Sequence, residues 1–292
     1  MDPTARIDAD PVVTRGEPIG LIAGGGDLPR LVARGMRRSG RPVHGIGLRG
    51  QYEPRLPAAC DHFSVAGALQ PGRWIRLLHR AGIREAVMVG SVTKRHMHDA
   101  RRILRELPDR HALDLWFRRL RHDRRNAAVL GAVADLLARH GITLIDSTTS
   151  IPEHLASPGV LTPHAPSNAQ RADLEFGASL LHRLVELDIG QAIAVRGRDV
   201  VAVEALEGTA RMIDRAGGLC GRRPWTLLKT AASEHDRRAD VPVVGVETIE
   251  QLHAAGGRCL GIGAGRVILL DRPRVLRAAA ARGIVVVGFD AS

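Results

Sequence analysis

Short apolar runs alternate with amphipathic stretches through the first half of the chain. The first run, at residues 18–23, ends at Gly24–Gly26, and a helical pattern follows from Leu31. A buried strand that enters a glycine turn and then a helix is the opening unit of a doubly wound parallel sheet. Further strands are predicted at 43–48, 61–65, 85–90 and 142–146, and helices at 73–81, about 98–107 and 111–140. The pattern predicts a Rossmann-like N-terminal domain over residues 17–148.

The pattern changes at residues 147–167, which are rich in Ser, Thr and Pro and show little periodicity. We therefore place a linker at 149–166 and a second domain at 167–292. Its predicted helices are 168–187, one from about Thr209, 248–255 and 273–281, and its predicted strands are 191–195, 200–205, 226–229, 243–246 and 284–288, with a hairpin at 260–270. The fold class predicted is α/β, a Rossmann-like parallel sheet domain plus a mixed α/β domain.

Several classes of protein are disfavoured by composition. The first 16 residues are polar, lack the apolar core of a signal peptide and are interpreted as a disordered tail. No apolar run approaches the roughly 20 residues that span a bilayer. The three cysteines, Cys60, Cys220 and Cys259, show no paired spacing, which argues against a disulfide framework or a zinc site. We expect a cytoplasmic protein.

The positive charge is concentrated in one window of the sequence. The chain has 42 Lys and Arg against 31 Asp and Glu, and residues 94–125 hold eleven of the basic residues and five of the acidic ones. Such a window can attract a phosphorylated substrate or anionic lipid headgroups, and contact with such lipids would hold the protein at a membrane surface. A solvated helix face is the alternative. Nucleic acid is the weakest option, because aromatic residues are not interleaved with the charges.

The glycines after the first predicted strand are candidates for phosphate binding. Glycines at a strand-to-helix turn let backbone N–H groups approach a phosphate at the start of a helix. The following strand end would lie at the same sheet edge, where ligands of such folds bind. A tight turn without a ligand explains the glycines equally well. The candidate substrate-binding residues at this edge are Gly25, Gly26, Asp27, Gly90 and Ser91.

Polar residues also gather around the predicted hairpin of the second half. Gln191 precedes its first strand, and Glu204 and Glu207 stand at the end of its second strand. Thr209 then begins a helix, whose N-terminus attracts an anion. Charge complementarity between Glu207 and that helix is the alternative reading.

A dense mixture of charges follows the strand that ends at Lys229. Asp236, Arg238 and Asp240 precede the apolar run that starts at Val241. Carboxylates hold Mg²⁺ through oxygen, and Lys and Arg bind phosphate oxygens. A solvated charged turn is the alternative on spacing alone.

Four segments together resemble the LpxI-type UDP-2,3-diacylglucosamine pyrophosphatases. They are Ile19–Gly26 with Leu28-Pro29, Leu187-Asp-Ile-Gly-Gln191, Val203-Glu-Ala-Leu-Glu-Gly-Thr209, and Asp236-x-Arg238-x-Asp240-Val-Pro-x-x-Gly245. The resemblance implies Mg²⁺-assisted attack of water on the α-phosphorus of UDP-2,3-diacylglucosamine, which releases UMP in lipid A synthesis. It also makes a homodimer plausible.

The resemblance assigns roles to individual residues. It implies that Asp240, in what is then the catalytic domain, is the critical acid, which holds the metal, activates the water or does both. The chemistry of the reaction places Mg²⁺ on Asp240 with Asp236 or Glu207, and Arg238 and Lys229 add positive charge. It carries substrate binding to Gly25, Gly26, Gln191, Glu207 and Thr209.

Two other functions are weighed against this one. A non-catalytic binder of a nucleotide sugar or lipid at a membrane surface would fit the basic window and the glycine loop. Grouped carboxylates at Asp236 and Asp240 argue against it, since a pure binder of an anion gains little from them. A nicotinamide-dependent oxidoreductase ranks last, because residues 44–49 supply no acidic ribose ligand.

Overall fold

The computed structural model describes residues 16–92, 107–122, 126–232 and 241–290. The chain divides into two compact units, one up to Ser150 and one from Ile151. The boundary lies within the predicted linker at 149–166, part of which forms short elements of the second unit. The tail and the predicted helix at 98–107 lie outside the described residues, apart from Gly16 and Leu107.

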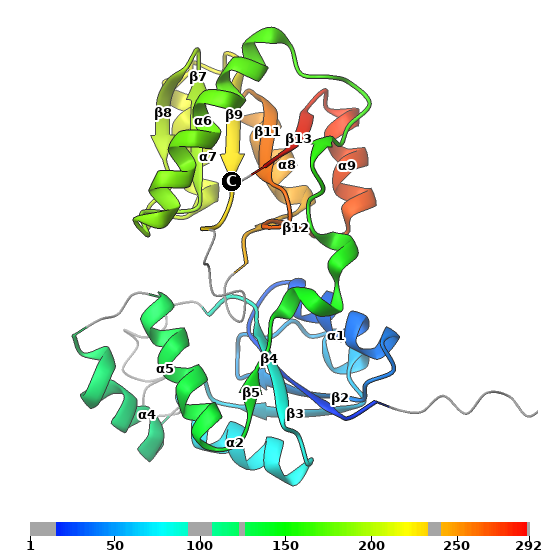
Figure 1. Cartoon of the computed structure of the whole chain (residues 1–292), viewed down its shortest axis with the longest axis vertical. Coiled ribbons are helices and arrows are strands. Elements are labelled where there is room, and N and C mark those ends of the chain that lie inside the picture. Colours follow the sequence, from blue (N-terminus) through cyan, green and yellow to red (C-terminus); the bar gives the residue numbers. More distant parts are fainter. Residues whose placement is uncertain (1–15, 93–106, 123–125, 233–240, 291–292) are drawn as a thin grey trace, which may run out of the picture. The chain divides into compact units, whose positions relative to one another are not determined.

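The first unit is built on a five-stranded, wholly parallel sheet in the order β3-β2-β1-β4-β5 (Figure 1). Its strands are β1 (Ile19–Ala23), β2 (Val43–Leu48), β3 (His62–Ala66), β4 (Glu85–Val89) and β5 (Thr143–Leu144). Its helices are α1 (Leu28–Arg38), η1 (Pro57–Ala59), α2 (Pro71–Arg80), α4 (Arg110–Leu115), the π-helical η3 (Trp116–Leu120), α5 (Asn126–Arg139) and η4 (Ser147–Ser150). This order confirms the predicted doubly wound sheet, with its switch point between β1 and β4.

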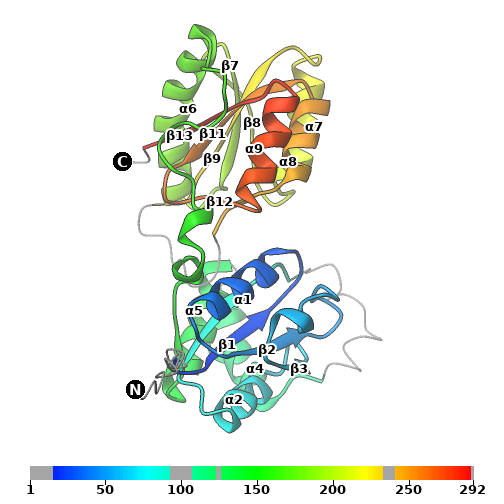
Figure 2. The same cartoon turned by 90° about the vertical axis from the view of Figure 1, so that its right-hand side faces the viewer.

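Helices cover both faces of this sheet. Trp74 and Leu78 of α2 and Leu137 of α5 belong to one apolar cluster with Ile22 and Ile46 of the sheet. Helix α1 lies on the opposite face (Figure 2). Every residue of β1 is buried, as expected for a central parallel strand covered on both sides.

The second unit has a six-stranded mixed sheet in the order β6-β13-β11-β9-β7-β8. The strands of this unit are β6 (Gly159–Val160), β7 (Ala192–Arg196), β8 (Asp199–Val203), β9 (Trp225–Lys229), β10 (Val243–Val244), β11 (Gly257–Gly263), β12 (Ile268–Leu269) and β13 (Val285–Phe289). Strands β10 and β12 lie outside the six-stranded sheet. Its helices are η5 (Pro152–His154), α6 (Asn168–Glu186), α7 (Thr209–Leu219), α8 (Val246–Ala254) and α9 (Arg272–Ala281). Strands β9, β11 and β13 are parallel, and β7 runs antiparallel to β9.

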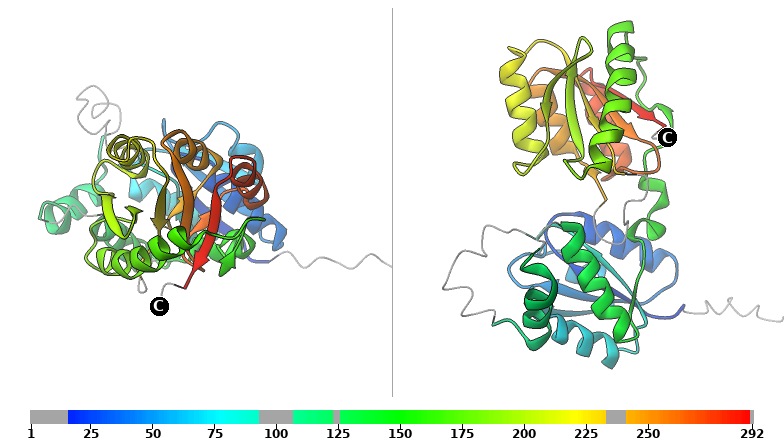
Figure 3. Two further views of the ribbon diagram at one scale, coloured as in Figure 1. Left: turned by 90° about the horizontal axis from the view of Figure 1, so that it is seen from above. Right: turned by 60° about the vertical axis from the view of Figure 1, so that its left-hand side comes forward.

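This unit has three layers. Helix α6 covers one face of the sheet through Leu174 and Leu181, while α7, α8 and α9 cover the other face through Met212, Ile249 and Val275. Figure 2 shows the sheet between these layers, and Figure 3 shows α6 and α7 on either side of the β7–β8 hairpin. The mixed α/β domain expected from the sequence is confirmed.

The hairpin predicted at residues 260–270 is wrong. Strand β12 does not fold back onto β11 but pairs in parallel with β10, where Ile268 lies opposite Val243. Strand β11 pairs instead with β9 and β13 on its two sides, so both of its edges are occupied. The two glycines that resembled a hairpin turn only redirect the chain between two sheets.

Candidate functional site

The glycine loop after β1 and the loop after β4 meet at the carboxyl edge of the first sheet. The amide of Gly25 donates to the carbonyl of Ser91 over 2.8 Å, and the amide of Ser91 donates back to Gly25 over 3.0 Å. A Cβ atom at Gly24 would lie 2.5 Å from the carbonyl oxygen of Ser91. The predicted neighbours therefore lie together, but the amides of Gly25 and Ser91 each donate to the carbonyl of the other residue and are not available to a phosphate.

The start of helix α1 next to this loop is open. Gly26 has a φ of +88°, and nothing lies within 4 Å of where its Cβ atom would be. Asp27 occupies the N-cap position, yet its side chain makes no capping hydrogen bond and pairs instead with Arg30 over 3.1 Å. Gly90 has a φ of +96° and packs against the backbone of Gly24, so its conformation and its surroundings both require glycine.

In the second unit, strand pairing brings three chain segments to one edge of the sheet. Ala192 at the start of β7 lies opposite Lys229 at the end of β9, and Ile193 lies opposite Val203 at the end of β8. The amide of Thr230 donates to the carbonyl of Gln191 over 3.0 Å. This edge, formed by the start of β7 and the ends of β8 and β9, is called the hairpin edge below.

A chain of hydrogen bonds crosses the hairpin edge. The ammonium of Lys229 donates to the hydroxyl of Thr209 over 3.0 Å, and that hydroxyl donates to the carboxylate oxygen Oε1 of Glu204 over 2.7 Å. Lys229 also donates to the carbonyl of Val243 over 3.2 Å. Lys229 is 8% exposed, so its charge is held almost entirely inside the protein. A buried ammonium needs such acceptors, because burial without them is costly.

A tight turn at Gly208 brings Thr209 into this chain of hydrogen bonds. Gly208 precedes α7 with a φ of +83°, a conformation that favours glycine, and takes the N-cap position without a side-chain cap. Glu204 is the member of the chain that sequence reasoning did not assign a role. Its signal in the sequence was its place directly after β8, five residues before Thr209.

Glu207 is close to Glu204 in the sequence but makes different contacts. Its carboxylate pairs with Arg215 of α7 over 2.5 Å, and Arg215 also donates to the carbonyl of Val203 over 2.9 Å. A hydrogen bond from its own backbone amide and the one from Arg215 hold the pKa of Glu207 below its ordinary value. Glu207 therefore fastens the loop after β8 to α7 as an ionised carboxylate.

The predicted residues Asp236, Arg238 and Asp240 lie outside the described residues. The ends of the chain on either side of them are described. Lys229 precedes the segment, and Val243, three residues after Asp240, accepts a hydrogen bond from the Lys229 ammonium. The described chain thus returns to the hairpin edge immediately after Asp240.

Within the described ranges, no group of three or more His, Cys, Asp or Glu side chains is placed to hold a metal ion. Burial raises the pKa of the Cys60 thiol to about 11 and that of the Cys259 thiol to about 12, which disfavours their reactive thiolate forms. Burial also raises the pKa of Cys220.

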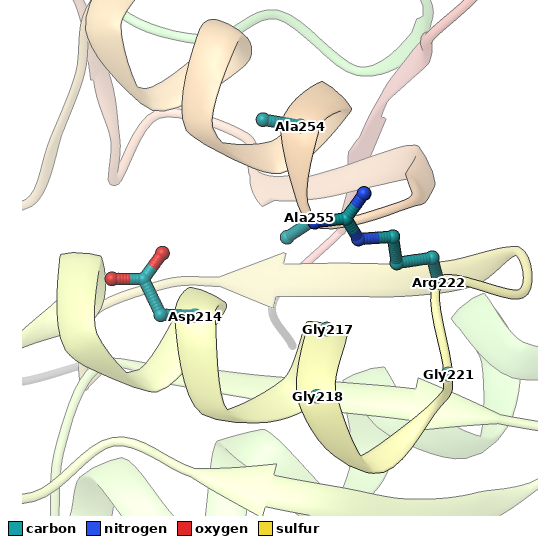
Figure 4. A pocket seen from close by; sticks show the side chains of 7 residues that line it. All are labelled: Asp214, Gly217, Gly218, Gly221, Arg222, Ala254 and Ala255. Atoms are coloured by element: carbon teal, nitrogen blue, oxygen red, sulfur yellow. The ribbon is translucent and has the colours of Figure 1, made fainter.

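A cavity of about 630 Å³ lies at the opposite edge of the second sheet (Figure 4). It is bounded by the last turns of α7 and α8, where the chain enters β9 and β11. Its only charged lining residues are Asp214 and Arg222, and Figure 4 shows them on separate sides of a floor made of glycine backbone. This cavity is remote from the chain of hydrogen bonds and offers little chemistry.

Comparison with known proteins places both units in one family. Residues 18–154 match the LpxI N-terminal domain, and residues 157–287 match the LpxI C-terminal domain. The chain belongs to the LpxI family. A protein of this family, the UDP-2,3-diacylglucosamine pyrophosphatase LpxI of Caulobacter vibrioides, is 29% identical over 282 residues, which cover 93% of this chain and 97% of the relative.

Two solved structures of other proteins are distantly similar to this chain. The GalE-like L-threonine dehydrogenase of Cupriavidus necator has 12% identity and a TM-score of 0.33, covering 94% of this chain and 79% of its own. A UDP-glucose-4-epimerase from Stenotrophomonas maltophila has 10% identity and a TM-score of 0.31, covering 90% of this chain and 92% of its own. Neither bears on the function.

Proposed function

We propose that this LpxI-family protein hydrolyses the pyrophosphate bond of UDP-2,3-diacylglucosamine in lipid A biosynthesis. The observation that carries the proposal is the family match along both units, together with a relative of that activity aligned over 97% of its length. Water adds to the α-phosphorus, and the bond from that phosphorus to the bridging oxygen breaks. UMP and 2,3-diacylglucosamine 1-phosphate are the products.

The hairpin edge supports this chemistry electrostatically. Negative charge develops on phosphoryl oxygens as the bridging bond breaks, and a fixed cation in a water-poor site stabilises that charge. Lys229 supplies such a cation, since it is 8% exposed and its position is fixed by Thr209 and Val243. The described chain meets this edge at Thr230, before the segment that carries Asp236, Arg238 and Asp240, and again at Val243, after it.

The proposal includes a divalent cation, Mg²⁺, held by Asp236 and Asp240. The described residues do not form a magnesium site by themselves, because Glu204 accepts from Thr209 and Glu207 is paired with Arg215. Mg²⁺ prefers carboxylate oxygen ligands, which is the chemistry of the two aspartates. The metal proposal therefore rests on these aspartates and on the family resemblance.

The location proposed is the cytoplasm, at the periphery of the inner membrane. Among the described elements, none is a helix both long and apolar enough to cross a bilayer. In the basic window, Arg118 pairs with Asp114 over 2.5 Å, and Arg119 pairs with Asp135. These pairs reduce the charge available to anionic lipid.

Sedimentation with anionic and neutral liposomes at two salt concentrations tests the membrane contact. Sedimentation velocity tests the homodimer that the family resemblance implies.

The activity is tested by incubating the purified protein with UDP-2,3-diacylglucosamine in detergent micelles and measuring UMP. We expect one UMP for each substrate molecule consumed. Binding of the UDP-lipid without UMP release would replace the proposal with the non-catalytic binder of nucleotide sugar or lipid. UDP-glucose serves as the control for a requirement for the acylated sugar.

A further inference from the structure

The donor and acceptor roles along the hairpin edge can be assigned without ambiguity. An ammonium group only donates, so the Thr209 hydroxyl must use a lone pair to accept from Lys229. The hydroxyl proton is then directed at Glu204 Oε1, 2.7 Å away. Glu204 therefore decides which way the hydroxyl points, and the hydroxyl decides where one of the Lys229 protons points.

Glu204 is itself held firmly. Its backbone amide donates to the carbonyl of Ala192 over 2.8 Å, which continues the β7–β8 ladder by one further bond. Its second carboxylate oxygen, Oε2, is buried and has no hydrogen-bond partner among the described residues. An unpartnered buried oxygen is costly, so networks that serve stability alone rarely keep one.

A carboxylate elsewhere in the same unit shows the contrast. Asp173 of α6 is 6% exposed, and both of its oxygens have donors. Oδ1 accepts from the amide of Arg198 over 2.8 Å, and Oδ2 accepts from the Thr226 hydroxyl over 3.4 Å. Each oxygen of Asp173 thus has a donor, whereas Glu204 keeps one oxygen without a donor among the residues that the structure describes.

We propose that Glu204 is a positioning residue for the hydrolysis. It orients the Thr209 hydroxyl and, through it, holds the Lys229 ammonium in the direction needed to stabilise charge on the pyrophosphate. This inference rests on the proposed function and extends it to a residue connected to Lys229 through the Thr209 hydroxyl.

The proposal predicts energetic coupling between Glu204 and Thr209. UMP release is measured for wild type, Glu204→Gln, Thr209→Val and the double variant. Glu204→Gln keeps an acceptor for Thr209 but removes the charge, and we expect kcat to fall roughly tenfold with little change in KM, as for loss of a supporting residue behind a catalytic group. Thr209→Val removes the connecting hydroxyl, so adding Glu204→Gln to it should cost no further activity.

Matched variants separate positioning from folding. Thr209→Ser restores the hydroxyl and should recover most of the activity lost in Thr209→Val. Asp173→Asn alters a structural buried carboxylate, and Glu250→Gln alters an exposed one paired with Arg282 over 2.7 Å. Asp173→Asn should lower the melting temperature without the kcat loss, and Glu250→Gln should change neither. If Glu204→Gln fails to fold, the Thr209→Ser and Thr209→Val pair still tests the connection.

The outcomes for the function and for Glu204 are distinguishable. A wild-type protein that releases no UMP overturns the proposed function, and this inference with it. An active wild type whose Glu204→Gln variant matches Glu250→Gln in kcat overturns the inference alone. Independent losses from Glu204→Gln and Thr209→Val that multiply in the double variant, or equal activity of Thr209→Ser and Thr209→Val, also overturn it.

Discussion

Gly190 lies directly against the backbone of Glu204. A Cβ atom at residue 190 would stand 2.1 Å from the Glu204 carbonyl oxygen, far inside van der Waals contact, and Gly190 has a φ of +151°. The loop that leads into β7 thus packs on the loop that leaves β8. This contact fixes the backbone of Glu204 and, with it, the start of the hydrogen-bond chain to Lys229.

Gly190→Ala should therefore damage both stability and turnover. The added methyl group meets a backbone carbonyl that cannot rotate away, so we expect a loss of unfolding free energy of about 1–3 kcal/mol, the usual cost of overpacking. Chemical denaturation and UMP release measure the two effects. Gly218→Ala is the matched control, because nothing lies within 4 Å of its added Cβ. Equal behaviour of the two variants would show that the close contact is absent in solution.

Lys229→Met should separate charge from packing. Methionine replaces a side chain that is 8% exposed with an apolar one of similar length, so the fold should survive. Loss of the buried cation should lower kcat roughly 100-fold, as when a preorganised donor to a developing oxyanion is removed. Lys229→Arg keeps the charge but not the geometry and should fall between. Wild-type kcat in Lys229→Met would remove this lysine from the reaction.

Asp240→Ala should abolish UMP release while leaving substrate binding and the fold largely intact. The expectation follows from the family resemblance and from the return of the chain to Lys229 three residues later, at Val243. Equilibrium binding of the UDP-lipid and circular dichroism check the two retained properties. Asp214→Asn, an exposed carboxylate on α7 at the opposite edge, should leave turnover unchanged. Undiminished turnover by Asp240→Ala would exclude Asp240 from the mechanism.

Removal of divalent metal should stop the reaction. After exhaustive chelation with EDTA we expect no UMP release, and addition of Mg²⁺ should restore it. The melting temperature is a second measurement, one that does not depend on activity. Mg²⁺ should raise it in the wild type and not in an Asp236→Ala, Asp240→Ala double variant. Full activity in the chelated protein would contradict the proposed metal.

His44 should make the first unit less stable in mild acid. Its ring lies 4.5 Å from that of His62 on the neighbouring strand, and burial, followed by the charge of His62, lowers the pKa of His44, while Asp61 acts in the opposite direction. A lowered pKa means that the folded state binds fewer protons than the unfolded state, so stability falls as the pH drops below 6.5.

Urea unfolding of the wild type and of His44→Gln at about pH 7.5 and about pH 5.5 measures this contribution, since these values bracket the ordinary histidine pKa. The wild type should lose more unfolding free energy between the two conditions than the variant does. His79→Gln, which alters a histidine on helix α2, controls for a general effect of losing one imidazole. An identical loss in wild type and His44→Gln would show that His44 titrates normally.

Local patterns in the sequence were sufficient to predict the α/β class of the fold. The wholly apolar run at β1, its glycine stop and the following helix predicted a parallel doubly wound sheet, because burial on both faces leaves no polar alternation. The same reasoning placed Lys229 at the end of a buried strand. The four family segments are also properties of the sequence alone, and they sufficed to indicate the family.

Pairing between distant segments was beyond the sequence. The pairing of β12 with β10 rather than β11 could not be predicted, because a strand of two residues has too little pattern to indicate its neighbour. Gly25 looked open to a phosphate, yet its amide is taken by Ser91, more than sixty residues away in the chain. The periodicity of a sequence indicates whether a residue is buried. Only the register between strands shows which residues lie next to it.

The hydrogen-bond chain shows the same division most clearly. The sequence by itself determined that Glu204, Thr209 and Lys229 stand at the ends of helices or strands, where functional side chains are often found. Only the tertiary structure decided that these three ends share one edge and that Glu204, rather than Glu207, faces Thr209. The reason is physical: antiparallel pairing of β7 with β8 and β9 sets the edge, and Glu207 pairs with Arg215 instead of Thr209.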